Sequence, residues 1–200
     1  NQYYMALSTS ISGVFTPQIN RIVARGEGDE QLTKLFTRVG RIQFMLLMLV
    51  LTGFVFVGEP FICAWGGEEY GAAYWIALLL IAPVTVPLIQ NIGIEIQRAK
   101  NMHQFRSKVY FCMAIGNALV SIPLGMKFGG IGCALGTAIS MVVGNGFIMN
   151  WYYQTHIGLD MRYFWKHILS IVPAMLPAVA LGIIAVRLHT FTGYAGVVTF

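Results

Sequence analysis

Polar side chains inside long apolar stretches are the residues of this 200-residue chain best suited to chemistry. The stretch 72–96 and the residues just after it hold Gln90, Asn91, Glu95 and Arg98. Helical spacing puts Asn91, Glu95 and Arg98 on one face, and a carboxylate three residues before a guanidinium can pair with it. Two interpretations stay open. The pair ends a helix at a membrane interface, or this face lines a water-filled cavity for a polar substrate.

Other residue types give no indication of catalysis. Asn117, in the apolar stretch 109–126, suits either a hydrogen bond between helices or the wall of a cavity. The three cysteines lie in apolar runs, and no phosphate-binding loop or metal-binding motif occurs. We therefore expect no enzyme, no cofactor and no metal site. The four histidines lie in loops or at the ends of apolar stretches: His103, His156, His167 and His189.

The composition sets the class of protein. Hydrophobic residues make up 56% of the sequence and charged residues only 10%. Soluble domains carry about 25% charged residues, so a soluble enzyme is excluded. A disordered chain is excluded too, because disorder requires low hydrophobicity. We expect an all-α integral membrane protein, built as a polytopic bundle of helices.

The apolar stretches predict the membrane spans. A helix needs about 20 mostly apolar residues to cross the hydrocarbon core. Residues 1–20 indicate the end of one span and residues 194–200 the start of another, so we expect the chain to be a fragment of a longer protein. The full spans are predicted at 42–65, 72–96, 109–126, 131–151 and 168–186.

Basic residues alternate with the predicted spans. Eleven of the 13 Lys and Arg lie in three segments, 21–41, 98–108 and 152–167. Cytoplasmic loops carry this excess, so we predict that all three face the cytoplasm. The net charge of +5 then indicates topology and contact with anionic lipid headgroups rather than nucleic-acid binding. Within 21–41 the apolar spacing predicts an amphipathic helix along the membrane surface, capped by Asp29.

Prolines and small residues mark the predicted spans. Prolines remove a backbone hydrogen bond and bend a helix, which suits either helices around a substrate cavity or plain packing. Small residues at four-residue spacing let a second helix approach closely, within this chain or in a homodimer. The bends are predicted at Pro17, Pro83, Pro87, Pro173 and Pro177. The small residues are Gly132, Gly136, Ser140 and Gly144.

An ordered series of motifs resembles a known family. The run Ser12–Ile19, followed by Arg21 and Arg25, is similar to the proline-bearing helix and basic exit of bacterial polysaccharide flippases. The runs IQNIGIEIQRAKNMHQFRS, FGGIGCALGTAIS and WYYQTHIGLDMRYF continue the similarity. Together they resemble the second half of a Wzx-type polysaccharide biosynthesis protein, in the multidrug/oligosaccharidyl-lipid/polysaccharide exporter superfamily.

The resemblance implies a fold and a function. The fold has two six-helix lobes around a central cavity, with additional C-terminal helices. The implied function is to flip an undecaprenyl-diphosphate-linked oligosaccharide across the bacterial cytoplasmic membrane by alternating access, with polysaccharide assembly machinery as a candidate partner. Arg21 and Arg25 would pair with the diphosphate or only anchor a helix end. A cation-coupled multidrug exporter of the same superfamily and a non-transporting structural membrane protein are the alternatives.

Overall fold

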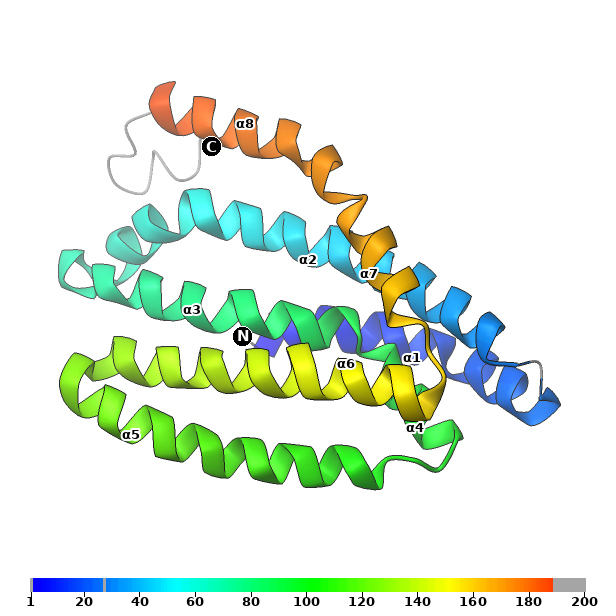
Figure 1. Ribbon diagram of the computed structural model, residues 1–200. Helices are drawn as coiled ribbons and strands as arrows, with labels where there is room; N and C mark the ends of the chain where they lie inside the picture. Colours follow the sequence, from blue (N-terminus) through cyan, green and yellow to red (C-terminus); the bar gives the residue numbers. More distant parts are fainter. Residues whose placement is uncertain (1, 27, 189–200) are drawn as a thin grey trace.

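The computed structural model describes residues 2–26 and 28–188, and only the backbone of residues 178, 181 and 184–188. These residues form an all-α bundle (Figure 1). The predicted start of a span at 194–200 lies outside the described residues. The helices, in chain order, are α1 (Gln2–Arg25), α2 (Asp29–Gly66), the short 3-10 helix η1 (Glu68–Tyr70), α3 (Gly71–Ile89), α4 (Ile92–Ala99), α5 (Gln104–Met141), the π-helical η2 (Val142–Ile148), α6 (Met149–Tyr152), the π-helical η3 (Tyr153–Ile157), α7 (Met161–Leu169) and α8 (Val172–Leu188).

Within the described residues, three helical stretches are long and apolar enough to cross a membrane. They are Asp29–Gly66, Glu68–Ile89 and Gln104–Ile157. Neither α1 nor the 17-residue α8 is among them. The three stretches indicate a membrane protein.

The stretch Gln104–Ile157 is a hairpin rather than one straight rod. Gly129 has φ 61° and ψ −141°, outside the helical region, and the chain reverses there (Figure 1). Glycine adopts positive φ without a steric penalty. The predicted spans at 109–126 and 131–151 therefore form the two arms of this hairpin, residues 104–128 and 130–157.

The amphipathic segment after α1 differs from its prediction. It is not a separate surface helix, because α2 continues without a break from Asp29 to Gly66. Gly40 contacts the Phe164 ring and the Ile89 carbonyl closely, so protein rather than lipid covers the apolar face. Asp29 does not cap the helix either. Gly28 holds the N-cap position, and no side-chain hydrogen bond is made there.

The prolines have two different structural roles. Pro17, Pro83, Pro87 and Pro177 lie inside helices. Pro173 lies in the first turn of α8, where a missing N–H costs no helical hydrogen bond. The predicted span 168–186 is correspondingly divided, because Leu169 ends α7 and Val172 begins α8.

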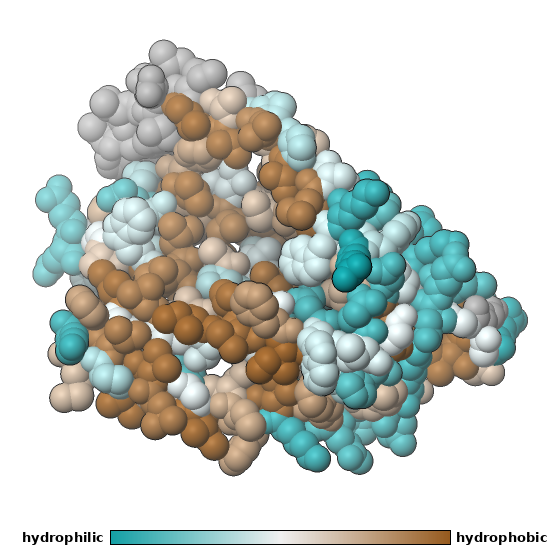
Figure 2. Space-filling view, viewed as in Figure 1, coloured by the Kyte–Doolittle hydropathy of each residue, from teal (hydrophilic) through white to brown (hydrophobic). Residues whose placement is uncertain are grey.

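The two ends of the bundle differ in charge. The α1–α2, α4–α5 and η3–α7 connections lie at one end, here called the basic end, and η1 and Gly129 lie at the other (Figure 1). Hydrophilic residues gather at the basic end, and apolar residues cover the middle (Figure 2). This separation of hydrophilic from apolar surface agrees with the alternation of basic segments along the sequence.

In the core, the Phe36 ring packs against the rings of Phe164 and Tyr153, with centroids 4.7 Å and 5.8 Å apart.

Candidate functional site

A cavity of about 460 Å³ lies between α1, α3, α4 and both arms of the hairpin. Four residues singled out from the sequence line it: Pro87, Asn91, Asn117 and Ser140. Its other polar residues come from α1 and the two arms, and its apolar residues come mainly from α3 and the first arm. The added polar residues are Thr9, Arg106, Tyr110, Thr137 and Asn145.

Arg106 supplies the positive charge of the cavity wall. One guanidinium nitrogen donates to the Tyr110 hydroxyl at 2.6 Å, and another donates to the Tyr153 hydroxyl at 3.3 Å. The guanidinium carbon also lies 4.8 Å from the centre of the Tyr110 ring, within the range of a cation–π contact. In the described part of the chain Arg106 has no carboxylate partner. Its charge remains available to an anion that enters the cavity.

The hydrogen bonds continue from Arg106 across the hairpin. The Tyr110 hydroxyl donates to Oδ1 of Asn145 at 2.9 Å, so the first arm is joined to η2 of the second. Further along the first arm, Ser121 donates to Oδ1 of Asn117 at 2.7 Å. The amide group of Asn117 is therefore held by its own helix. The wall of the cavity is a set of positioned amides and hydroxyls beside one cation.

Gln90, a candidate cavity residue from the sequence, has a different position in the structure. It is 2% exposed and does not line the cavity. Its amide nitrogen donates to Oδ1 of Asn150 at 2.8 Å, and the indole nitrogen of Trp165 donates to the same oxygen at 3.2 Å. This buried contact joins the turn after α3 to the second arm of the hairpin and to α7.

Glu95 and Arg98 form the expected ion pair, with 2.8 Å between Oε1 of Glu95 and a guanidinium nitrogen. The side chain of Arg98 is 66% exposed, and neither residue lines the cavity. The face predicted to carry Asn91, Glu95 and Arg98 is thus divided. Asn91 faces the cavity, and the pair lies at the surface.

Arg21 and Arg25 line a second cleft, also of about 460 Å³, at the basic end of α1. Pro17 and Gln18 from the same helix and Gln31 from α2 contribute to its wall. The two arginines therefore lie apart from the residues of the first cavity. They form a basic surface outside that cavity, whereas Arg106 lines the cavity itself.

The row of small residues lies against the first arm of the same hairpin. A Cβ at Gly136 would lie 2.8 Å from the Cα of Ser121, and one at Gly132 would overlap the Leu124 carbonyl. A Cβ at Gly144 would overlap the sulfur of Met113. Intramolecular packing accounts for these three glycines.

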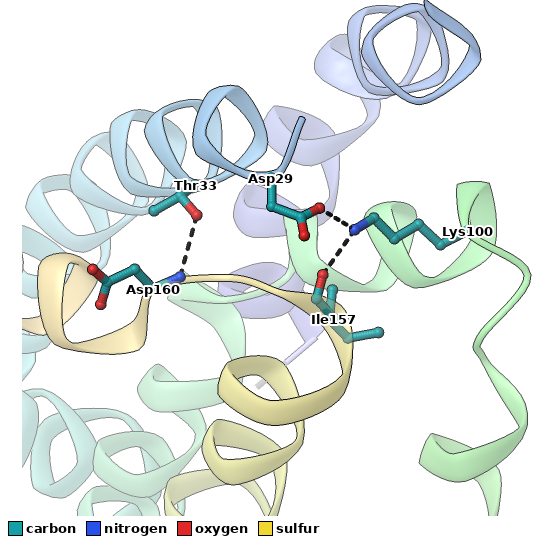
Figure 3. A network of polar contacts seen from close by, with 5 residues as sticks. All are labelled: Asp29, Thr33, Lys100, Ile157 and Asp160. Atoms are coloured by element: carbon teal, nitrogen blue, oxygen red, sulfur yellow. Dashed lines mark hydrogen bonds and ion pairs between the residues drawn. The ribbon is translucent and has the colours of Figure 1, made fainter. Parts of the chain in front are cut away.

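A polar network at the basic end fixes the far end of α4 (Figure 3). Lys100 directly follows α4. Its Nζ contacts Oδ1 of Asp29 at 2.5 Å and donates to the Ile157 carbonyl at 2.8 Å. Nearby, the backbone N–H of Asp160 donates to the Thr33 hydroxyl at 3.2 Å. Because Ile94 of α4 and Asn91, the residue before this helix, line the cavity, this network supports one of its walls.

Comparisons with known proteins do not assign this chain to a family. No protein-family model, curated protein or solved structure matches it. The resemblance to polysaccharide flippases accordingly stays a prediction from the sequence. The case for a function depends on the cavity and on its charges.

Sequence reasoning did not identify Arg106, Tyr110, Thr9 and Thr137 as site residues. Arg106 was assigned to a loop that orients the chain, whereas it lies in the first turn of α5. The four-residue spacing between Arg106 and Tyr110 could have indicated that their side chains lie together, because residues i and i+4 share a helical face. No group of three or more His, Cys, Asp or Glu in the described residues could hold a metal ion.

Proposed function

We propose that this chain forms part of a membrane transporter that flips an undecaprenyl-diphosphate-linked oligosaccharide across the bacterial cytoplasmic membrane by alternating access. The observation that carries the proposal is the cavity lined by Arg106, Asn91, Asn117 and Asn145 among apolar helices. Polar side chains are costly at membrane depth and generally mark a substrate path.

The chemistry of the cavity suits the two polar parts of that substrate. Amide and hydroxyl groups pair with sugar hydroxyls, as donors and as acceptors. The guanidinium of Arg106 pairs with phosphate oxygens in a charge-assisted contact. Arg21 and Arg25, in the separate cleft at the basic end, would attract the same diphosphate before it enters. The polyprenyl tail would remain in the surrounding lipid.

The main alternative is a cation-coupled multidrug exporter. Carboxylates would pair with a cationic drug, and none of the described Asp or Glu residues lines this cavity, whereas Arg106 does. The sign of the charge therefore favours an anionic substrate. A structural membrane protein without transport is the other alternative; topology would explain a basic residue at this position, but not its place in the wall of a polar cavity.

The test is the substitution Arg106→Gln, compared with Lys108→Gln two residues along the same helix. Lys108 does not line the cavity. Loss of a charge-assisted contact of about 1.5–3 kcal/mol corresponds to a fall in transport of roughly tenfold to a hundredfold. Lipid-linked repeat units should accumulate on the inner leaflet, and surface polysaccharide should decrease. Arg106→Lys, which keeps the charge, should retain part of the activity.

Membrane abundance and thermal stability of each variant are measured first. Unchanged surface polysaccharide in a correctly inserted Arg106→Gln protein would exclude Arg106 from transport. Intact polysaccharide after removal of the whole gene, together with greater sensitivity to cationic drugs, would support the multidrug exporter instead.

A further inference from the structure

A third recess, separate from the cavity and from the cleft at Arg21 and Arg25, is a polar groove between α2 and α7 at the basic end. Its volume is about 310 Å³. Lys34, Arg38 and Arg41 contribute from α2, at a spacing of four and then three residues that keeps them on one face. Tyr163 and His167, one turn apart on α7, form the opposite wall.

The positive charge of this groove is only partly neutralised. Nζ of Lys34 lies 2.7 Å from Oε1 of Glu30, in an exposed pair one turn apart. Arg38 and Arg41 are exposed, and no carboxylate or carbonyl in the described residues pairs with either guanidinium. Two adjacent guanidiniums without an anion make the groove attractive to a negatively charged group. Guanidinium groups match phosphate geometry especially well.

Thr37 provides an independent indication of a ligand. It lies between Lys34 and Arg38 on α2, lines the same groove and is only 3% exposed. Its hydroxyl oxygen is buried and has no hydrogen-bond partner. A buried hydroxyl without a partner costs roughly 1–3 kcal/mol, and such groups are uncommon in folded proteins. An oxygen acceptor bound in the groove would supply the missing hydrogen bond.

The groove has an apolar side as well as a basic one. Ile42 and Met45, one and four residues after Arg41 on α2, line the groove and are 40% and 45% exposed. Leu46 and Leu49 continue this exposed apolar surface along the helix. The change from guanidinium to apolar side chains within one turn matches the boundary between lipid headgroups and acyl chains. A ligand that spans this boundary must be amphipathic.

We propose that the groove between α2 and α7 binds an anionic membrane lipid. The lipid phosphate pairs with Arg38 and Arg41 and accepts a hydrogen bond from the Thr37 hydroxyl. One acyl chain lies along Ile42 and Met45. A free phosphate ion would satisfy the charges and the hydroxyl but leave these apolar side chains without a partner, so the apolar side selects the lipid. This site is separate from the proposed transport cavity and does not depend on it.

The experiment measures the thermal stability of the detergent-purified protein during titration with short-chain phosphatidylglycerol. Wild-type protein should be stabilised by this lipid, and less by phosphatidylcholine, which is zwitterionic, or by inorganic phosphate. Arg38→Gln with Arg41→Gln should weaken apparent affinity for the lipid at least tenfold. The matched control is Arg162→Gln with Lys166→Gln, which removes the same charge from α7 outside the groove. The control should change affinity less than threefold.

Thr37→Val keeps the test valid if the arginine variant does not fold. This nearly isosteric change removes the unpaired hydroxyl, so the lipid-free protein should be at least as stable as wild type. Affinity for phosphatidylglycerol should nevertheless fall several-fold. Equal losses in the groove and control variants would overturn the proposal, because the attraction would then be general. Full stabilisation by inorganic phosphate alone, or unchanged affinity in Thr37→Val, would overturn it too.

Discussion

At the scale of single residues, Lys100 makes a contact on which three segments depend. Its ammonium group joins Asp29 at the start of α2 to the Ile157 carbonyl at the end of η3 (Figure 3). The Lys100 side chain is 20% exposed and that of Asp29 is 54% exposed. Partial burial of the Lys100 side chain makes this pair stronger than a fully exposed one.

We expect Lys100→Met to destabilise the protein by about 1–2 kcal/mol, less than a fully buried charged hydrogen bond because Asp29 remains partly solvated. Methionine keeps the length of the side chain and removes its charge. The measurement is unfolding in detergent, with Asp29→Asn and the double variant completing a thermodynamic cycle. Effects that simply add would show that the two residues do not stabilise each other.

Residue-level prediction from the sequence succeeded where partners are close in the chain. The pairing of Glu95 with Arg98 follows from three-residue spacing alone. The contact of Gln90 with Asn150 joins residues 60 positions apart, and no local pattern indicates it. Arg106 was missed for a related reason, because a basic residue between two spans also orients the chain. Only the fold shows that it faces a cavity.

At the scale of elements, the hairpin depends on close approach of its arms. Gly136 lies against the backbone of Ser121, where a Cβ would come within 2.8 Å of the Ser121 Cα. A Cβ at Gly116, on the first arm, would meet no atom within 4 Å. The two glycines therefore offer a matched comparison within one element.

We expect Gly136→Ala to destabilise the protein by about 1–3 kcal/mol, because the arms must move apart to admit the methyl group. Gly116→Ala should be neutral or stabilising by up to about 1 kcal/mol, since alanine favours the helix. Thermal unfolding of both variants in the same detergent compares them. A Gly136→Ala protein as stable as Gly116→Ala would contradict the close packing of this row.

The elements were predictable to different degrees. Apolar length predicted the stretches 109–126 and 131–151, and the structure places them on the two arms of the hairpin. The continuity of α2 was not predictable, because its amphipathic face suits a membrane surface as well as the packing against Phe164. Tertiary contacts decide between those environments.

At the scale of the whole molecule, the separation of charge along the bundle predicts its orientation. The α4–α5 connection lies at the basic end, and η1 with Glu68 and Glu69 lies at the opposite end (Figure 1). Cytoplasmic loops carry the excess of Lys and Arg. The basic end should therefore face the cytoplasm.

Labelling with a membrane-impermeant thiol reagent tests this orientation. Cys63, Cys112 and Cys133 are first replaced, and a single cysteine is introduced at Gln104 or at Glu69, both of which are exposed. In intact cells the reagent should label position 69, and it should label position 104 only after the membrane is permeabilised. Labelling of position 104 from outside would reverse the predicted topology.

The π-helical segment η2 has a consequence for how this chain tolerates insertions and deletions. A π-helical turn accommodates one residue more than the α-helical turn it replaces. Loss of one residue from 142–148 would let this segment return to regular α-helix, because the deletion removes the extra residue that the π-helical turn accommodates. Later side chains would keep nearly their present orientation, and Tyr153, now 1% exposed beside Gly93, would stay in the core. A single-residue deletion within η2 should therefore be tolerated better than one in the regular α-helix of residues 130–141, where each lost residue turns every later side chain by about 100°.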